Sequence, residues 1–219
     1  MHIILKAFSP AIAIMILLAS SSGAEPSPDI RQREIQKGCA SMEQSRRAKI
    51  GKPAPDFSLD AVVGREFKKV SLSEYRGKWV VLFFYPLDFT AVCPTEIKGF
   101  NKALDDFSQK NTVILAVSVD SKWSHKAWIE RGDLGTLNYP LLSDLKKNTA
   151  RDYGVLDEEA GVALRGLFII DDRGILQYLS VNNLSVGRSI EETMRVLDAL
   201  QTGELCPLNW KPGQKTLGK

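Results

Sequence analysis

The hydrophobic residues of the chain fall into two kinds of pattern, continuous apolar runs and runs with helical spacing. Residues 79–85, WVVLFFY, form an unbroken apolar run of strand length, and residues 112–119 form a second one. Runs of this kind are typical of strands that are buried on both faces of a sheet. Two further runs, residues 167–170 and 175–181, flank the turn sequence DDRG (171–174) and predict a hairpin.

Apolar residues with helical spacing predict the helices. Residues 96–107 repeat apolar side chains every three to four positions, which predicts a helix. We expect further helices over residues 123–131 and 146–153, and a last one that begins after the capping residue Ser189. The side chains on one face of that last helix are Ile190, Thr193, Met194, Leu197 and Leu200.

The alternation of strands and helices predicts an α/β fold with a central mixed sheet flanked by helices. The closing hairpin predicts one antiparallel edge. This is the plan of a thioredoxin-like fold, although other α/β sandwiches share the pattern. The length of 219 residues, of which 44% are hydrophobic and 25% charged, is enough for one hydrophobic core, and we expect no second domain.

The amino terminus departs from this globular pattern. Lys6 precedes an apolar run over residues 7–18, and small residues follow up to Ala24. This order predicts a cleavable signal peptide over residues 1–24, and the apolar run is too short for a comfortable membrane span. We therefore expect an exported protein, periplasmic or secreted. An uncleaved anchor is one alternative, and a start at Met42, which would leave the protein cytoplasmic, is another.

The rest of the chain divides into three parts. Residues 25–49 are polar and contain Pro26 and Pro28, which predicts a flexible N-terminal arm. Residues 50–202 contain the alternating strands and helices and form the predicted domain. Residues 203–219 follow the last predicted helix as a C-terminal arm.

Charge and the rarer residue types exclude several classes of protein. The 29 basic and 26 acidic residues are interspersed and leave a formal net charge of +3, which gives no reason to expect nucleic acid or a membrane as a partner. The three cysteines form no Cys-x-x-Cys pair, and a metal site would need His125 together with cysteines that lack ligand spacing. The sequence also contains no Gly-x-Gly-x-x-Gly for a dinucleotide. We expect neither a metal nor a cofactor.

Cys93 lies where a predicted buried strand gives way to a helix. Residues 84–96 read FYPLDFTAVCPTE, in which Pro94 suits the first turn of a helix. A thiol at this position faces free backbone N–H groups and the positive end of the helix dipole, and both favour the reactive thiolate. His125 lies in a polar stretch with helical character, so we expect a group other than imidazole to activate the thiol. From position alone, an inert buried thiol stays the alternative.

The residues around Cys93 resolve this alternative. Pro86, Thr90 and Cys93 match the Pro-x-x-x-Thr-x-x-Cys signature of peroxiredoxins, within a nearly complete family block over residues 84–96. The chain resembles the typical two-cysteine peroxiredoxins over residues 50–215. The resemblance implies a thioredoxin-like fold and a thiol-dependent peroxidase that reduces hydrogen peroxide and organic hydroperoxides, with a role in antioxidant defence.

The resemblance also implies a role for each site residue. Cys93 is expected to attack the terminal peroxide oxygen and to become a sulfenic acid. Thr90 would hydrogen-bond the peroxide, and Pro86 would shield the pocket from bulk water. Arg165 would stabilise the thiolate and the charge on the departing oxygen, and Glu96 would orient that guanidinium.

Cys206 follows the last predicted helix, within the sequence CPLNWKPG. This segment resembles the resolving-cysteine segment of typical two-cysteine peroxiredoxins. The resemblance implies an intersubunit disulfide between Cys93 and Cys206, hence a homodimer, and in many relatives a decamer. It also implies a dithiol reductant, either a thioredoxin-like protein or a dedicated disulfide reductase. Cys39 has no counterpart in the shared core and is either an incidental thiol of the arm or a link between chains.

Two departures from the family pattern concern over-oxidation of Cys93. Relatives that over-oxidise readily carry Gly-Gly-Leu-Gly and a long tail with a Tyr-Phe pair. This chain has GDLG at residues 132–135, and its sequence stops at Lys219. We therefore expect resistance to sulfinic acid formation.

Two other functions rival the peroxidase. A chaperone-like holdase activity would depend on assembly rather than on the chemistry of Cys93. A disulfide oxidoreductase on the same fold is disfavoured because Cys-x-x-Cys is missing.

Overall fold

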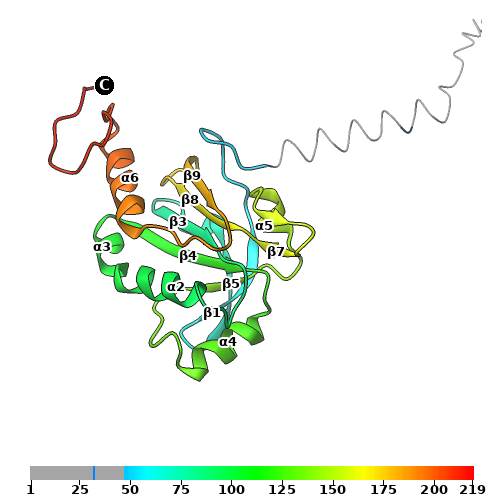
Figure 1. Cartoon of the computed structure of the whole chain (residues 1–219). Coiled ribbons are helices and arrows are strands. Elements are labelled where there is room, and N and C mark those ends of the chain that lie inside the picture. Colours follow the sequence, from blue (N-terminus) through cyan, green and yellow to red (C-terminus); the bar gives the residue numbers. More distant parts are fainter. Residues whose placement is uncertain (1–31, 33–46) are drawn as a thin grey trace, which may run out of the picture. The chain divides into compact units, whose positions relative to one another are not determined.

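The computed structural model of the chain describes residue 32 and residues 47–219 (Figure 1). The predicted signal peptide over residues 1–24 and Cys39 lie outside the described residues, as does nearly all of the predicted arm over residues 25–49. Among the described residues, no helix has both the length and the apolar character needed to cross a membrane.

A seven-stranded mixed sheet lies at the centre of the fold, with the strand order β2-β1-β5-β4-β3-β8-β9. Strand β4 pairs in parallel with both β3 and β5, and the other pairs are antiparallel. The strands are β1 (Ser58–Val63), β2 (Glu66–Ser71), β3 (Trp79–Phe84), β4 (Thr112–Ser118), β5 (Leu141–Ser143), β8 (Arg165–Ile170) and β9 (Leu176–Asn182). A separate small hairpin joins β6 (Leu156–Asp157) to β7 (Val162–Ala163).

Helices cover both faces of the sheet (Figure 1). They are η1 (Leu72–Tyr75), α2 (Cys93–Lys102), α3 (Leu104–Gln109), α4 (Lys122–Arg131), α5 (Asn148–Asp152) and α6 (Ile190–Thr202). The side chains of β3 alternate between two cores, as the pleat of a strand requires. Val81 and Phe83 belong to the core under α2, α3, α4 and α6. Val80, Leu82 and Phe84 belong to the core on the opposite face, under η1 and α5.

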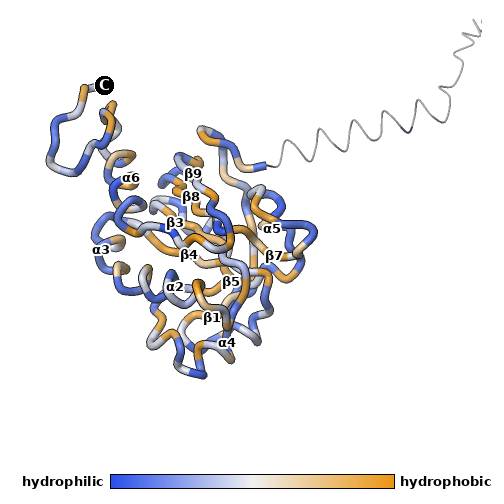
Figure 2. The backbone as a smooth tube through the Cα atoms, viewed as in Figure 1, coloured by the Kyte–Doolittle hydropathy of each residue, from blue (hydrophilic) through white to orange (hydrophobic). Residues whose placement is uncertain are grey.

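The predicted fold class is confirmed: the chain has the central mixed sheet and flanking helices of a thioredoxin-like fold. The two continuous apolar runs form β3 and β4, whose side chains are almost all buried. The predicted hairpin forms β8 and β9, and Ser189 caps α6 by accepting a hydrogen bond from the N–H of Glu192 at 3.1 Å. Figure 2 shows the hydrophobic residues concentrated on the central strands.

Two predicted helices were wrong in extent. The helix predicted over residues 96–107 begins at Cys93, where the sequence around Pro94 also predicts a helix start, and it is divided into α2 and α3 at Ala103, whose φ of −89° and ψ of 4° leave the helical region. The helix predicted over residues 146–153 is shortened to α5. Lys147 has a left-handed φ of 61°, which a right-handed helix cannot include, so α5 begins after it, at Asn148.

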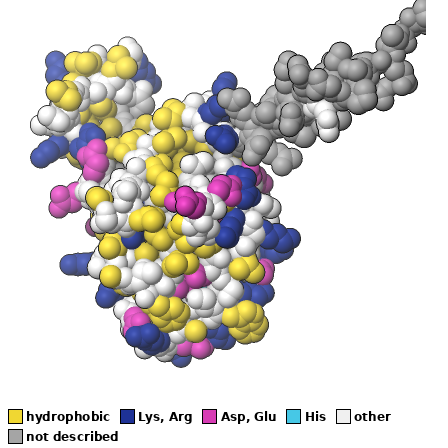
Figure 3. All heavy atoms as spheres, turned by 45° about the vertical axis from the view of Figure 1, so that its right-hand side comes forward, with side chains coloured by type: hydrophobic (Ala, Val, Ile, Leu, Met, Phe, Trp, Pro, Cys, Tyr) yellow, Lys and Arg dark blue, Asp and Glu magenta, His cyan; other side chains and the backbone are white. Residues whose placement is uncertain are grey.

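The charges of the domain are distributed as the sequence predicts. On the face shown in Figure 3, acidic and basic side chains are interspersed with hydrophobic and neutral ones. Surface charges of mixed sign produce no strong field over a wide area.

Candidate active site

The site forms at the carboxyl end of β3, where residues 85–92 connect the strand to α2. Helix α2 begins at Cys93 and carries Pro94 in its first turn, as predicted. Among the described residues, no side chain caps this helix, so its N-terminal end stays open toward the thiol. The side chain of Cys93 is fully buried in this conformation.

Arg165 reaches the same place from β8. Because β8 pairs antiparallel with β3, with Leu167 opposite Phe83, the first residue of β8 lies beside the end of β3. Nη1 of Arg165 lies 3.5 Å from Sγ of Cys93 and donates to Oε2 of Glu96 at 2.6 Å. Its Nε donates to the carbonyl oxygen of Leu184 at 2.7 Å. The guanidinium is therefore fixed at both ends and faces the sulfur.

A second arginine, Arg188, binds the same carboxylate and was not predicted. Its Nε and Nη2 each donate to one carboxylate oxygen of Glu96 at 2.7 Å, and its Nη1 donates to the carbonyl oxygens of Phe84 and Gly166. Burial lowers the pKa of Arg188, and the carboxylate of Glu96 opposes that shift. Two guanidinium groups share one carboxylate, so the buried cluster keeps an excess of positive charge that an anionic sulfur would balance.

Thr90 and Pro86 lie in the connection between β3 and α2. Pro86 is buried, whereas Thr90 is exposed and its hydroxyl donates to the carbonyl oxygen of Leu87 at 3.0 Å. Phe89, between them, has a left-handed φ of 57°. The described hydrogen bonds join Cys93 to Arg165 and leave Thr90 bonded within its own loop.

His125 lies in a stretch that is polar in sequence, yet it is on the inward face of α4. It is fully buried on α4, and its Nδ1 lies 2.8 Å from Oδ2 of Asp88. Its neighbours Trp128 and Ile129, three and four residues on, are buried as well, so the three share the inward face of the helix. The prediction that imidazole does not activate Cys93 agrees with this placement, because Asp88 and the carbonyl oxygen of Leu142 occupy both ring nitrogens.

Comparison with known proteins gives the family. The sequence profile of the AhpC/TSA family matches residues 50–179. Peroxiredoxin-2 of Macaca fascicularis is 53% identical over 181 residues, which cover 79% of this chain and 91% of the relative. The chain belongs to the AhpC/TSA family. The reduced 2-Cys peroxiredoxin of Plasmodium vivax matches the fold with a TM-score of 0.73 and 45% identity, covering 76% of this chain and 91% of that one. AhpC of Mycobacterium bovis matches with a TM-score of 0.68 and 42% identity, over 75% and 99%.

The peroxiredoxins and AhpC proteins that the chain matches show that it is a thiol-dependent peroxidase. Its relatives include proteins named peroxiredoxin in animals and a chloroplastic 2-Cys peroxiredoxin of Spinacia oleracea. Within the described residues, no three His, Cys, Asp or Glu side chains gather as a metal site would require.

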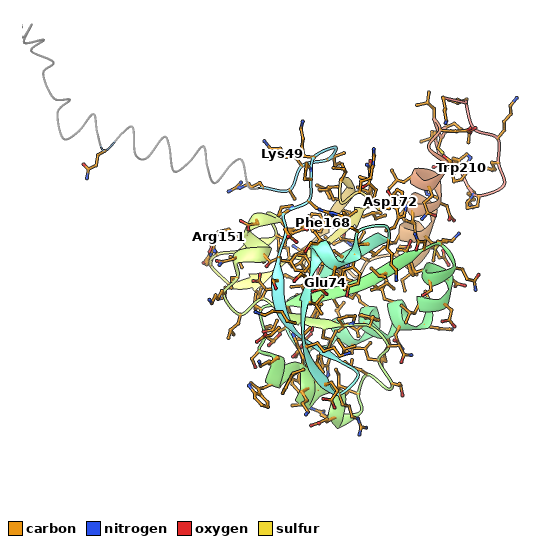
Figure 4. All side chains as sticks on the ribbon, turned by 180° about the vertical axis from the view of Figure 1, so that it is seen from behind. Lys49, Glu74, Arg151, Phe168, Asp172 and Trp210 are labelled. Atoms are coloured by element: carbon orange, nitrogen blue, oxygen red, sulfur yellow. The ribbon has the colours of Figure 1, made fainter. Side chains whose placement is uncertain are left out.

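The second thiol of this peroxiredoxin, Cys206, lies in different surroundings. It is partly buried after α6, with Sγ 3.7 Å from the carbonyl oxygen of Ala199 and 3.6 Å from the hydroxyl of Thr202. Cys93 and Cys206 are both free thiols. Residues 203–219 fold back on themselves, because the N–H of Leu205 donates to the carbonyl oxygen of Gly218 at 2.8 Å. Trp210 is buried within this segment beside α6 (Figure 4).

Proposed function

We propose that Cys93 is the peroxidatic thiol of this peroxidase. The observation that supports the proposal most directly is the 3.5 Å contact between Sγ of Cys93 and a guanidinium that Glu96 holds in place. A fixed cation stabilises negative charge on the sulfur, and the open N-terminal end of α2 adds to that effect.

The first chemical step is displacement at oxygen. The thiolate of Cys93 attacks the terminal oxygen of a hydroperoxide, an S–O bond forms, and the O–O bond breaks. The sulfur becomes a sulfenic acid, and the electron pair of the O–O bond leaves on an alkoxide or hydroxide that takes a proton from solvent. Arg165 and Thr90 supply donors whose bonds strengthen as charge develops, and Pro86 keeps the pocket dry.

Cys206 of the partner subunit then resolves the sulfenic acid. Its sulfur attacks Sγ of Cys93, an intersubunit disulfide forms, and the hydroxyl leaves as water. The proposal is supported by the separate surroundings of the two thiols, since Cys206 lies on a segment that folds on α6 of its own chain. The functional unit is accordingly a homodimer, which further association would extend to a decamer. A thioredoxin-like protein or a disulfide reductase then reduces the disulfide by thiol–disulfide exchange.

Export to the periplasm or beyond the cell is part of the proposal and is supported by the sequence of residues 1–24. Mapping the N-terminus of the protein purified from its natural host tests it, since cleavage is expected near Ala24. A protein that begins at Met1 or Met42 would contradict export by a cleaved signal. A protein that begins at Met42 lacks Cys39 altogether, whereas in a cytoplasmic protein that begins at Met1 the thiol of Cys39 would meet the cytoplasmic thiol pool, where disulfides between chains do not persist.

Single-turnover trapping tests the roles of the two cysteines. One equivalent of hydrogen peroxide should give a disulfide-linked dimer in the unmodified protein. The Cys206→Ser variant should stop at a sulfenic acid on Cys93 that dimedone traps, and the Cys93→Ser variant should form neither product. Peroxide consumption by Cys93→Ser at the unmodified rate would refute the proposal. The same Cys93→Ser variant separates a holdase activity, which it should retain, from the peroxidase.

A further inference from the structure

A buried polar cluster lies directly behind the loop that carries Thr90. It consists of Tyr85, Asp88, Asp120, Ser124 and His125. The side chains of Tyr85 and His125 are fully buried, and Asp88 is 6% exposed. The peroxidase chemistry of Cys93 uses none of these groups, so their burial needs another explanation.

Asp88 is the centre of this cluster. Its Oδ1 accepts a hydrogen bond from the hydroxyl of Tyr85 at 2.9 Å, and its Oδ2 accepts one from the hydroxyl of Ser124 at 2.7 Å. The same Oδ2 lies 2.8 Å from Nδ1 of His125, and the N–H of Asp88 donates to Oδ2 of Asp120 at 2.9 Å. Both the side chain and the backbone of Asp88 are therefore tied to neighbouring elements, chiefly to α4.

The protons of the Asp88–His125 pair follow from the acceptors around it. Nε2 of His125 lies 3.2 Å from the carbonyl oxygen of Leu142, which only accepts, so Nε2 carries a hydrogen. A second hydrogen lies between Nδ1 and the carboxylate of Asp88. Removing one member of the pair would leave the other buried without its partner, which is costly.

Two other titratable groups face this pair. Burial raises the pKa of Tyr85, and the charge of Asp88 adds to the rise. Burial also raises the pKa of Asp120, and Asp88 again adds to the rise while His125 opposes it. The cluster therefore contains one basic group among acidic ones, and His125 is the member that balances Asp88.

The residue after Asp88 shows what the cluster holds in place. Phe89 has a left-handed φ of 57°, which is strained for a bulky side chain and persists only where the surroundings impose it. Its ring packs on Trp128 of α4 at 5.6 Å between centroids, and the guanidinium of Arg131 lies 5.6 Å from its centroid. Helix α4 therefore holds both Asp88, which precedes the strained residue, and the ring of the strained residue Phe89 itself. Thr90 is the next residue in the chain.

We propose that the Asp88–His125 pair is a positioning element for peroxide binding, which fixes the strained loop so that the Thr90 hydroxyl faces the substrate. The pair touches no substrate and acts through Thr90. The inference rests on the proposed role of Cys93, and it adds the residues that prepare the pocket for the peroxide.

The test compares two reactions of Cys93 in each variant. Hydrogen peroxide needs Thr90 in place, whereas alkylation by iodoacetamide needs the thiolate and access to it but no hydrogen bond from Thr90. In the full-length His125→Gln variant, the rate with peroxide should fall about 10- to 100-fold, as expected for a reacting group displaced by about 1 Å. The rate of alkylation should stay within about threefold, because the contact of Arg165 with the sulfur is untouched.

A double variant excludes a merely structural role. In a Thr90→Val background the hydroxyl is already lost, so His125→Gln should cost little further peroxide reactivity, although its effect on thermal stability should persist. Ser124→Ala and Tyr85→Phe each remove one bond to Asp88 and should give smaller losses of the peroxide rate, about threefold. These milder variants decide the test if His125→Gln does not fold.

Asp144→Asn is the matched control. Asp144 is also a buried carboxyl, 1% exposed, and it accepts from the N–H groups of Thr149 and Ala150 away from the loop. It should lower the melting temperature and leave the ratio of peroxide to alkylation rates unchanged. An unchanged ratio in all cluster variants, or full additivity with Thr90→Val, would overturn the inference. Absence of any peroxide reaction at Cys93 in the unmodified protein would instead refute the proposed function.

Discussion

The two thiols of the described domain contact opposite kinds of hydrogen-bonding group, a cationic donor and a neutral acceptor. Sγ of Cys93 lies 3.5 Å from a guanidinium nitrogen of Arg165 and is fully buried. Sγ of Cys206 lies 3.7 Å from the carbonyl oxygen of Ala199, near the C-terminal end of α6. The guanidinium of Arg165 therefore donates toward the sulfur of Cys93, whereas the thiol of Cys206 donates toward the carbonyl oxygen.

The two regions also differ in how firmly their side chains are held. Cys93 begins a helix whose next acidic residue, Glu96, is fixed by Arg165 and Arg188. Cys206 lies on a segment with exposed leucines, of which Leu208 is 92% exposed. The contrast fits the proposed mechanism, in which the attack on peroxide needs a fixed anion and the resolving step needs a thiol that can leave its resting contacts.

Substitution of each cysteine by serine should have the largest effect on the reaction with peroxide and on turnover. Cys93→Ser should abolish reaction with peroxide, because a hydroxyl in the same place is a far weaker nucleophile. Cys206→Ser should leave the first reaction unchanged and abolish turnover with a dithiol reductant. Stopped-flow measurement of the first reaction and a steady-state assay separate the two. Equal effects of both variants on the first reaction would contradict the division of roles.

Substitution of Arg165, the arginine beside the sulfur of Cys93, should have the next largest effect on the rate with peroxide. Arg165→Lys keeps the charge but cannot contact both Glu96 and Cys93 with one planar group, so the rate with peroxide should fall about 10²- to 10³-fold. Arg195 is the matched control, since it donates to the carbonyl oxygen of Trp210 in the segment that holds Cys206. Arg195→Lys should leave the rate of Cys93 unchanged. A comparable loss in both variants would show that the effect is not local.

The sequence predicts β3 and β4, which are buried on both faces, and the hairpin of β8 and β9, but it misses β1, β2 and β5. Strand β3 is nearly all apolar, so its pattern has one interpretation. Strand β2, with the sequence EFKKVS, lies at the edge of the sheet and is mostly exposed, so its alternation is weak. The division of the helix at Ala103 has no local signal either, because alanine favours a helix and only tertiary packing breaks it there.

The site is predicted to a similar extent. Cys93, Glu96 and Arg165 follow from the family signature, and the structure brings them together. Arg188 was missed because it lies outside the segments from which the family resemblance was read, and a contact with Glu96 across 92 residues leaves no local pattern in the sequence. The burial of His125 was also missed, although Trp128 and Ile129 at helical spacing from it were a usable signal.

Removal of Trp210 sharpens the contrast in rigidity. This side chain is 4% exposed, and its Nε1 donates to the carbonyl oxygen of Gln214 at 3.0 Å. Trp210→Ala should release residues 203–219, so that Cys206 is alkylated faster while the rate at Cys93 is unchanged. The local cost is about 3–5 kcal/mol at most, as for a buried tryptophan, and it falls on the segment rather than on the melting of the domain. Mass spectrometry of each cysteine after brief alkylation measures both rates.

Trp123→Ala is the control for loss of an indole. Trp123 is 65% exposed on α4, so its removal should affect neither thiol. Faster alkylation of Cys93 in Trp210→Ala would contradict the independence of the two regions.

The smallest effect concerns the ion pair that supports the Cys206 region. The hydrogen bond from Arg195 lowers the pKa of Glu192 from its ordinary value of 4.5. Because the pKa of Glu192 is lower in the folded state, the pair stabilises the fold at pH values above the pKa of the unfolded state. This contribution is lost as the pH falls through the pKa of the folded state. The pair is largely exposed, so it contributes about 0.2–0.5 kcal/mol.

Hydrogen exchange of residues 203–219 should therefore accelerate slightly as the pH is lowered below about 4.5, beyond the intrinsic pH dependence of exchange, because Arg195 then holds Trp210 less firmly. In Glu192→Gln this acceleration should be absent, since the variant lacks the charge at every pH. Exchange in α2 should not respond, because Glu192 and Arg195 lie on α6 and hold the segment after that helix. A matching response in α2 would show that acid loosens the whole domain, and the Cys206 region would not be the more labile of the two.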